Sequence, residues 1–394
     1  MDELTSRERV AKAFAHQEPD RVPLFELSID SSPAAAIMGR EMWMGRMGAN
    51  ARRANQMAAV GAAVDFTERM RRDTLDLWHT LGLDMIVLPR PERCTGRVMK
   101  TLSENQWRFT DPLTGYWEDY AYSTHSDTYS QVGSSLDDGD ERDFEHYIAA
   151  LEHIEHRPQD YDLESLDRWL EGTRNLFVLM GADVDYPPAN RTWAKLFLEC
   201  LVLRPDLIDR YLDTQMKARL LLVEEAFQRG VDGILAGNDW ATSTGPLISP
   251  KHFHRFILPR FLQLVDLCRA NGKVMVKHTD GDIRVLEPLL FDESGIDGWH
   301  PVDPTVGLTI SEYKKRYGKR ITLIGNVNCA TTLVNGTREE VIAETKAIIH
   351  TGAPGGGYIL SSSNSIHAGV KPELYRTMLE TARKFGTYPI KRRS

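Results

Sequence analysis

The stretch VMVKHTDG, residues 274–281, is a short apolar run that ends in a histidine and an acid two residues apart. Side chains of an extended strand alternate between its two faces, so His278 and Asp280 would project the same way from the strand end. Such a pair can bind a metal ion or transfer a proton, or it can be a histidine held by a nearby carboxylate. The stretch predicts a buried strand with a candidate functional pair at its carboxyl end.

Seven further segments have the same form, a short apolar run followed by polar or turn residues, with helix-like segments between them. They cover residues 22–27, 83–89, 176–183, 233–240, 296–301, 321–328 and 357–364. Short apolar strands that alternate with helices indicate parallel pairing and right-handed crossovers. Eight of them in one chain predict an α/β protein with a closed (β/α)8 barrel, or TIM barrel, rather than an open sheet.

Two segments add to the eight repeated units. A capping box at Thr5 and Glu8 predicts a helix through Phe14, which forms an N-terminal helical extension. Residues 91–135, after the second strand, show alternating runs and turn signals that predict an inserted antiparallel β flap. Its many aromatic residues form either a small satellite core or a wall over a ligand. We expect a single domain over residues 1–394 that includes this flap.

Composition excludes several classes of protein. With 394 residues, of which 42% are hydrophobic and 26% charged, the chain is typical of a soluble globular protein. It contains no run of eighteen apolar residues, and residues 1–5 lack a signal-peptide core, so we expect no membrane association and a cytoplasmic location. The net charge of −8 gives no reason to expect nucleic acid. The four cysteines show no CxxC spacing, which argues against a zinc ribbon and a disulfide framework.

The polar residues that end the strands are the candidate site. In barrel enzymes the carboxyl ends of the strands lie at one face and carry the chemistry. These residues are Glu26, Asp183, Asn238, Asp239, His278, Asp280, His300, Asn326, Asn328, Ser362 and Asn364.

Several segments, in their order and spacing, resemble the uroporphyrinogen decarboxylase-like superfamily, and together they cover nearly the whole chain. They are RERV (7–10), PDRVP (19–23), GPLISP (245–250), HTDG (278–281), GNV (325–327) and GGYIL (356–360). The resemblance implies a barrel fold and one of two activities. One branch contains decarboxylases, and the other contains cobamide-dependent methyltransferases that move a methyl group to or from the cobalt of a separate corrinoid protein.

Three departures from the family pattern bear on the choice between the branches. The decarboxylases carry an arginine-rich segment after the first strand, whereas residues 24–30 here read LFELSID and place an acid, Glu26, where a polyanion needs cations. The methyltransferase branch has a His-x-Cys pair of zinc ligands on the fifth strand, and this chain keeps the spacing with His278 and Asp280. A further cysteine ligand of that branch matches Asn364.

The resemblance therefore implies zinc or another divalent cation at His278, Asp280 and Asn364, with Asp239 as a further oxygen ligand. Oxygen ligands in place of two thiolates make such a site harder and less selective for zinc. The alternative is a hydrogen-bonded cluster in which His278, poised by Asp280, transfers protons directly. In both cases we predict His278, Asp280 and Asp239 as the catalytic residues.

The predicted reaction is methyl transfer from a methoxylated small molecule to the cobalt of a corrinoid protein, as in an O-demethylase. The missing cysteines disfavour thiol methylation, and an ether needs stabilisation of its leaving oxygen, which a cation or a proton donor supplies. The aromatic flap and Trp240 are compatible with an aromatic donor. The predicted substrate contacts are Glu26, Asn238, Trp240, His300, Asn326, Asn328 and Ser362.

Two other functions stay open at this point. One is a carboxy-lyase similar to uroporphyrinogen decarboxylase, and the other is a barrel that has lost catalysis and serves as a binding subunit. The expected partners of the methyltransferase are the corrinoid protein, which carries the cobamide, and the methyl donor. The sequence leaves the oligomeric state open, with a homodimer as one option.

Overall fold

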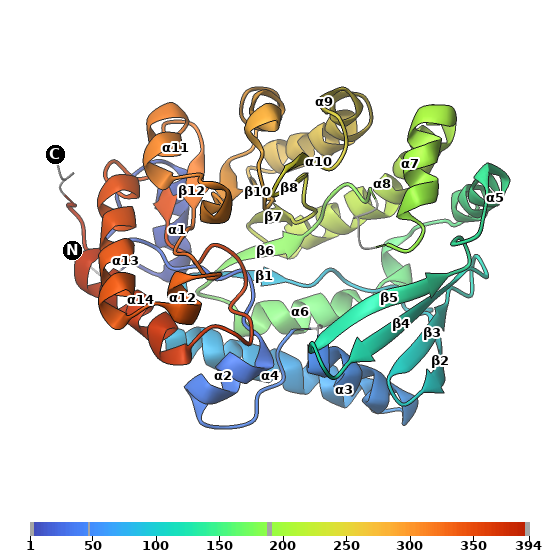
Figure 1. Cartoon of the computed structure of the whole chain (residues 1–394), viewed down its shortest axis with the longest axis horizontal. Coiled ribbons are helices and arrows are strands. Elements are labelled where there is room, and N and C mark those ends of the chain that lie inside the picture. Colours follow the sequence, from blue (N-terminus) through green and yellow to red (C-terminus); the bar gives the residue numbers. More distant parts are fainter. Residues whose placement is uncertain (1–3, 46–47, 187–190, 391–394) are drawn as a thin grey trace.

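A computed structural model describes residues 4–45, 48–186 and 191–390 of the chain. A curled parallel sheet surrounded by helices forms one part of it, and a separate antiparallel sheet extends to one side (Figure 1). Within the described residues the parallel sheet has seven strands. In their hydrogen-bonded order they are β1 (Met85–Leu88), β6 (Phe177–Gly181), β7 (Gly233–Ala236), β10 (Val274–His278), β11 (Gly298–His300), β12 (Thr322–Ile324) and β13 (Tyr358–Ile359).

The first predicted strand, residues 22–27, is not a regular strand of this sheet, and the prediction of eight strands is corrected accordingly. Leu24 forms a parallel bridge with Leu360, just after β13, and Phe25 forms one with Met85 at the start of β1. The segment thus lies between the two edge strands of the sheet. Its ladder stays short because Pro23 has no amide hydrogen and the Leu24 amide donates to the Asp84 carboxylate instead.

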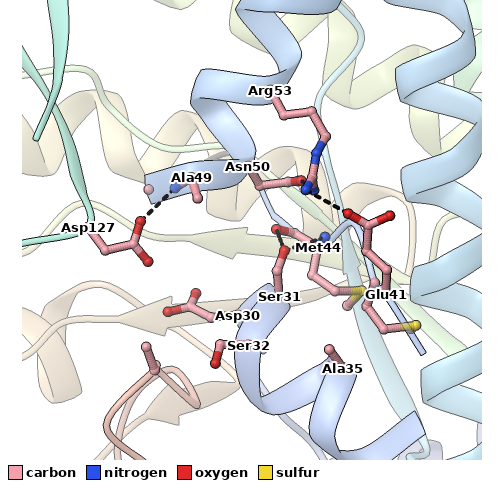
Figure 2. A pocket seen from close by; sticks show the side chains of 13 residues that line it. Asp30, Ser31, Ser32, Ala35, Glu41, Met44, Ala49, Asn50, Arg53 and Asp127 are labelled. Carbon is pink, nitrogen blue, oxygen red and sulfur yellow. Dashed lines mark hydrogen bonds and ion pairs between the residues drawn. The ribbon is translucent and has the colours of Figure 1, made fainter. Parts of the chain in front are cut away.

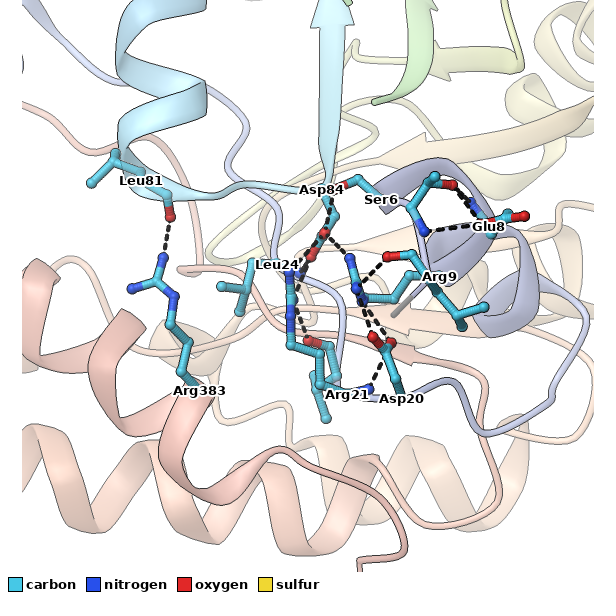
Figure 3. Close-up of polar contacts among 12 residues, drawn as sticks. Ser6, Glu8, Arg9, Asp20, Arg21, Leu24, Leu81, Asp84 and Arg383 are labelled. Atoms are coloured by element: carbon cyan, nitrogen blue, oxygen red, sulfur yellow. Dashed lines mark hydrogen bonds and ion pairs between the residues drawn. The ribbon is translucent and has the colours of Figure 1, made fainter. Parts of the chain in front are cut away.

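A buried carboxylate, Asp84, holds this junction together (Figure 3). It has no exposed surface and accepts hydrogen bonds from Arg9 at 2.8 Å, Arg21 at 2.7 Å and the Leu24 amide at 2.8 Å. The Ser6 hydroxyl donates to it at 2.7 Å. Two arginines and two neutral donors stabilise the negative charge of Asp84, which would be unfavourable in an apolar interior without such partners. The network joins the first helix, residues 22–27 and β1. We call residues 22–27, which lie between the two edge strands, the junction segment.

The predicted capping box is confirmed, because Thr5 and Glu8 cap α1 (Ser6–Phe14) reciprocally. The Arg7 amide donates to the carbonyl of Asn175 ahead of β6, and Thr322 at the start of β12 donates to the Ala13 carbonyl. Helix α1 therefore covers the amino ends of the strands. The opposite face, at the carboxyl ends, is left for the site.

Period-two alternation along the strands separates two apolar clusters. Leu179, Leu235 and Val276 pack in an inner cluster with Val10 of α1, while their neighbours along the strands, such as Met275, join the outer cluster beneath the helices. Burial on both faces explains why these strands are continuous apolar runs.

The remaining helices cover the sheet and the flap. They are α2 (Ser31–Met38), α3 (Gly48–Ala59), α4 (Ala63–Leu81), α5 (Glu141–Glu152), α6 (Leu163–Gly172), α7 (Ala194–Leu203), α8 (Pro205–Gln228), α9 (Pro250–His252), α10 (Leu258–Ala270), α11 (Ile310–Arg316), α12 (Thr332–Asn335), α13 (Arg338–Gly352) and α14 (Pro372–Phe385). Short 3-10 helices span Pro158–Asp160, Arg284–Leu286 and Pro304–Val306, π-helical turns span Phe253–Ile257 and Pro288–Glu293, and a two-stranded ladder pairs β8 (Ala241–Thr242) with β9 (Gly245–Pro246). Among the described residues no helix is long and apolar enough to cross a bilayer.

The predicted antiparallel flap is confirmed within residues 91–135. It is a meander of β2 (Val98–Ser103), β3 (Gln106–Thr110), β4 (Trp117–Ser123) and β5 (Thr128–Ser134), and it lies against α3 (Figure 1). Trp107 is buried and forms a satellite core with Tyr129. Tyr120 and Tyr129 also line a cavity of about 460 Å³ between the flap and α3. The aromatic residues thus form a core, and a ligand under them stays a prediction.

The Asp84 network predicts that Asp84→Asn lowers the free energy of unfolding by about 1–3 kcal/mol, because Arg21 loses its carboxylate partner and Arg9 keeps only that of Asp20. Urea denaturation followed by circular dichroism measures this change. Asp76→Asn is the control, since the Asp76 side chain is 60% exposed and its pair with Arg40 should contribute less than about 1 kcal/mol. Equal losses for the two variants would contradict a central role for Asp84.

Candidate active site

The carboxyl ends of β7 and β10 bring three predicted catalytic residues together. His278 ends β10, Asp280 follows two residues later, and Asp239 comes three residues after β7. The His278 Nε2 atom lies 3.7 Å from Asp239 Oδ1 and 3.9 Å from Asp280 Oδ1. One potential ligand atom of each residue lies within 4.8 Å of the others. A nitrogen and two carboxylate oxygens therefore face a common point.

Asn364 holds Asp280 in place. Its Nδ2 donates to Asp280 Oδ2 over 2.5 Å, while its own Oδ1 accepts from the Ser365 amide. The amide nitrogen, and not the oxygen expected of a metal ligand, therefore faces the cluster. The other oxygen, Asp280 Oδ1, is buried and accepts no hydrogen bond from any residue that the structure describes. A buried carboxylate oxygen with no donor is the feature that a bound cation would satisfy.

His300 lies behind His278 and orients it. The two Nδ1 atoms are 2.8 Å apart, and His300 Nε2 lies 3.3 Å from Ser361 Oγ. If His278 donates from Nδ1, His300 accepts there and donates onward to Ser361, which leaves the His278 Nε2 lone pair facing the carboxylates. His300 was predicted to contact substrate, but it has no exposed surface, so its role here is to position His278.

Burial shifts the pKa values of His278 and Asp280 so that both side chains favour their uncharged forms. Burial lowers the pKa of His278 to about 4, although the negative charge of Asp239 opposes the shift. Burial raises the pKa of Asp280 to about 7, and the charges of Asp239 and Asp303 add to the rise. Near neutral pH the imidazole is therefore uncharged, as a ligand nitrogen must be, and Asp280 keeps its proton in part of the molecules. A cation would compensate the carboxylates and displace this proton.

A buried ion pair supports the loop that carries Asp239, and sequence reasoning missed it. Lys277 has no exposed surface; it donates to Asp183 at 2.8 Å and to the Asn238 carbonyl at 2.5 Å. The Asn238 amide also donates to Asp183. A lysine inside an apolar strand was the available signal, because lysine is almost never fully buried unless it is paired.

Most of the other predicted substrate contacts are buried behind the site. Trp240 packs on Phe253 and Phe261, and Asn326 donates to the Val302 carbonyl. These predicted contacts are corrected to supporting roles, because both side chains are nearly inaccessible.

Three more predicted contacts also have internal partners. The Ser362 hydroxyl donates to Glu26 at 2.6 Å, and burial raises the pKa of Glu26 to about 8, although the Ser362 hydrogen bonds oppose the shift. Asn328 accepts from the amides of Ala330 and Thr331 and so caps the turn before α12. Glu26 and Ser362 have no exposed surface, so they cannot touch a substrate in this conformation.

A cleft lies at the carboxyl ends of β1, β6 and β7, and its lining includes none of the three cluster residues. It consists of two adjoining cavities of about 610 and 290 Å³, which share Arg90, Tyr147, Asp185 and Gln215. The smaller, inner cavity reaches Asn238, the residue before Asp239. Asn238 is thus the predicted substrate contact that lines this cleft. The shared residues come from loops after β1 and β6 and from helices α5 and α8, so no strand pattern could have indicated them.

A further cavity of about 300 Å³ lies between α2, α3 and the flap (Figure 2). Its lining includes none of the predicted site residues. Several of its polar groups are already bonded: Asp127 accepts from the Ala49 amide, and Arg53 pairs with Glu41. We therefore place the candidate active site at the His278 cluster, with the cleft that reaches Asn238, and not in this cavity.

Comparison with known proteins supports the expected superfamily. Residues 190–385 match the family model described as uroporphyrinogen decarboxylase (URO-D). A relative named methylcobamide:CoM methyltransferase MtaA, from Methanosarcina barkeri, is 28% identical over 167 residues, which are 41% of this chain and 47% of the relative. A uroporphyrinogen decarboxylase from Pseudoalteromonas translucida is 23% identical over 188 residues, 46% of each chain. The chain thus spans about half the length of these relatives.

The fold has a full-length counterpart among solved structures. A methyltransferase from Methanosarcina mazei aligns with 97% of this chain and 99% of its own, with a TM-score of 0.60 and 19% identity. This match shows a shared fold, and the family model and the relatives show a similarity to the uroporphyrinogen decarboxylase-like superfamily, as expected from the sequence.

The pKa of Asp280 predicts how cation binding depends on pH. Below about pH 7 a cation must displace the Asp280 proton, so the affinity for Zn²⁺ should fall about tenfold for each further pH unit. Isothermal titration of chelator-treated protein between about pH 6 and 8 measures this dependence. Asp280→Asn should abolish the binding of Zn²⁺. Asp282→Asn is the control and should leave it intact, since Asp282 pairs with Arg284 outside the cluster. An affinity that rises on acidification would contradict this assignment.

Proposed function

We propose that the protein is the methyltransferase component of a corrinoid-dependent system, with a divalent cation held by Asp239, His278 and Asp280. The observation that carries the proposal is the open, buried oxygen of Asp280 beside the free nitrogen of His278. One imidazole and two carboxylates suit zinc and also harder divalent cations. The relative named methylcobamide:CoM methyltransferase supports the choice of reaction.

The proposed reaction moves a methyl group from the oxygen of a methoxylated donor to reduced cobalt. The carbon–oxygen bond breaks, the carbon–cobalt bond forms, and the leaving oxygen keeps the bonding electron pair before it gains a proton. The barrier lies chiefly in the poor leaving group, since an alkoxide or phenolate is a strong base. A cation in the cluster would act as a Lewis acid toward this oxygen.

The chain's own residues provide the positioning. His300 fixes the ring of His278, and Asn364 fixes one oxygen of Asp280, so the two functional atoms keep a constant direction. Lys277 and Asp183 fix the backbone around Asn238 and thereby Asp239. Such preorganisation is what transition-state stabilisation requires.

The donor would lie in the inner part of the cleft, where aromatic side chains are available for contact. Tyr147, Tyr186, Trp193 and Tyr211 line this cavity of about 290 Å³. Aromatic walls suit an aromatic methoxy compound, which can stack on them. The cobamide would be carried by a separate corrinoid protein that approaches the carboxyl-end face.

A decarboxylase is the second candidate, because one relative carries that name. The junction segment weighs against it. Glu26 occupies the position of the cationic clamp, and it is fully buried and uncharged near neutral pH because its pKa is raised to about 8. Release of carbon dioxide from carboxylated substrates, without methyl transfer, would favour the decarboxylase.

Methyl transfer itself tests the proposal. Purified protein, reduced cobalamin and a panel of methoxylated donors should yield methylcobalamin, which absorption spectra detect. His278→Ala should lower the rate at least about a hundredfold, because it removes the only imidazole facing both carboxylates among the described residues. His254→Ala is the control, since His254 is 65% exposed and lies outside the cluster. Full activity in His278→Ala would refute the assignment.

A further inference from the structure

The cleft contains one arginine whose charge is not compensated by a direct contact. Arg90 follows β1 by two residues, is exposed, and lines both the inner and the outer cavity. Within the described ranges it makes no hydrogen bond and no ion pair shorter than 4 Å. Its guanidinium group is therefore free to bind an anion inside the cleft.

The other arginines of the cleft are engaged. Arg219 pairs with Asp185, Arg191 pairs with Glu118 at 3.1 Å, and a further arginine, Arg97, contacts the second oxygen of the same glutamate. The outer cavity has one more arginine, Arg93, which bonds to the Glu155 carbonyl and to Asp160. Each of these arginines contacts a carboxylate, although Arg191 and Arg97 share the single charge of Glu118, whereas Arg90 contacts none among the described residues.

One acid of the cleft, Asp185, senses the charge of Arg90 without a direct contact. Asp185 is half-buried and pairs with Arg219. Burial raises the pKa of the Asp185 carboxyl, and the charge of Arg90 opposes the rise, so the two groups sense each other without direct contact. An anion bound at Arg90 would share the cleft with Asp185, whose negative charge Arg219 already compensates.

The inner cavity extends from Arg90 to Asn238, and its lining includes none of the three cluster residues. Arg90 and Asn238 both line it, and the residue after Asn238 is Asp239. The same cavity is lined by Trp193 and Tyr211, whose ring centroids are 5.9 Å apart in an edge-to-face arrangement. A flat ring in this cavity could present one end to Arg90 and the other toward Asn238, which precedes Asp239.

We propose that Arg90 selects methyl donors that carry a carboxylate at the end remote from the methyl group, that is, methoxylated aromatic acids. This inference rests on the proposed function. A guanidinium binds a carboxylate through two parallel hydrogen bonds, which supply orientation as well as affinity. The carboxylate at Arg90 would thus direct the methoxy group toward His278 and its two carboxylates.

Binding measurements without cobalamin test the inference separately from catalysis. The probes are the three ring isomers of methoxybenzoate and the matching methoxybenzamides, which have the same shape but no charge. Isothermal titration to the zinc-loaded protein should show that at least one acid binds about tenfold to a hundredfold more tightly than its amide. Arg90→Gln should remove this preference by weakening acid binding much more than amide binding, whereas Arg90→Lys should retain part of it.

Arg338→Gln is the matched control, since it removes the same charge from an exposed arginine on α13, whose pair with Glu380 spans 3.8 Å. Its acid-to-amide ratio should equal that of the native protein. The inference is overturned if no acid binds, if acids and amides bind equally, or if Arg90→Gln keeps the preference. Acid binding that depends on Arg90, without formation of methylcobalamin, would support the inference and refute only the proposed reaction.

Discussion

The buried Asp84 carboxylate is the constraint on which the closure of the sheet depends. A charge without exposed surface is tolerated only with full compensation, and Arg9, Arg21 and the Leu24 amide provide it. These donors tie α1 and the junction segment to β1, and the junction segment in turn bridges the first and last strands. With the sheet curled in this way, residues far apart in the chain meet at its carboxyl ends.

The candidate site has a layered construction. Asp239, His278 and Asp280 face a common point, and a second set of residues fixes each of them: His300, Asn364 and the pair of Lys277 with Asp183. His300, Lys277 and Asp183 are buried and Asn364 is half-buried, so most of these hydrogen bonds are protected from water and hold their directions. The polar residues at the strand ends therefore form two groups. One group faces the common point of the cluster, and the other holds the first group in its orientation.

The sequence predicted the parallel strands, the capped helices and the flap because these features have local signatures in periodicity and turn residues. It also predicted that His278 and Asp280 share a face, which follows from the geometry of a strand end. It could not predict that Pro23 and Asp84 shorten the first strand, or that His300 lies behind His278. These outcomes depend on contacts between distant segments, as do the unpaired state of Arg90 and the orientation of the Asn364 amide.

The central claim is that three side chains at the ends of β7 and β10 form a cation site. Anomalous diffraction at the zinc absorption edge, from crystals grown with Zn²⁺, tests it most directly. The claim predicts a peak about 2.0–2.2 Å from His278 Nε2, Asp280 Oδ1 and a carboxylate oxygen of Asp239. Crystals with zinc bound elsewhere, or with no peak between these three residues, would contradict it.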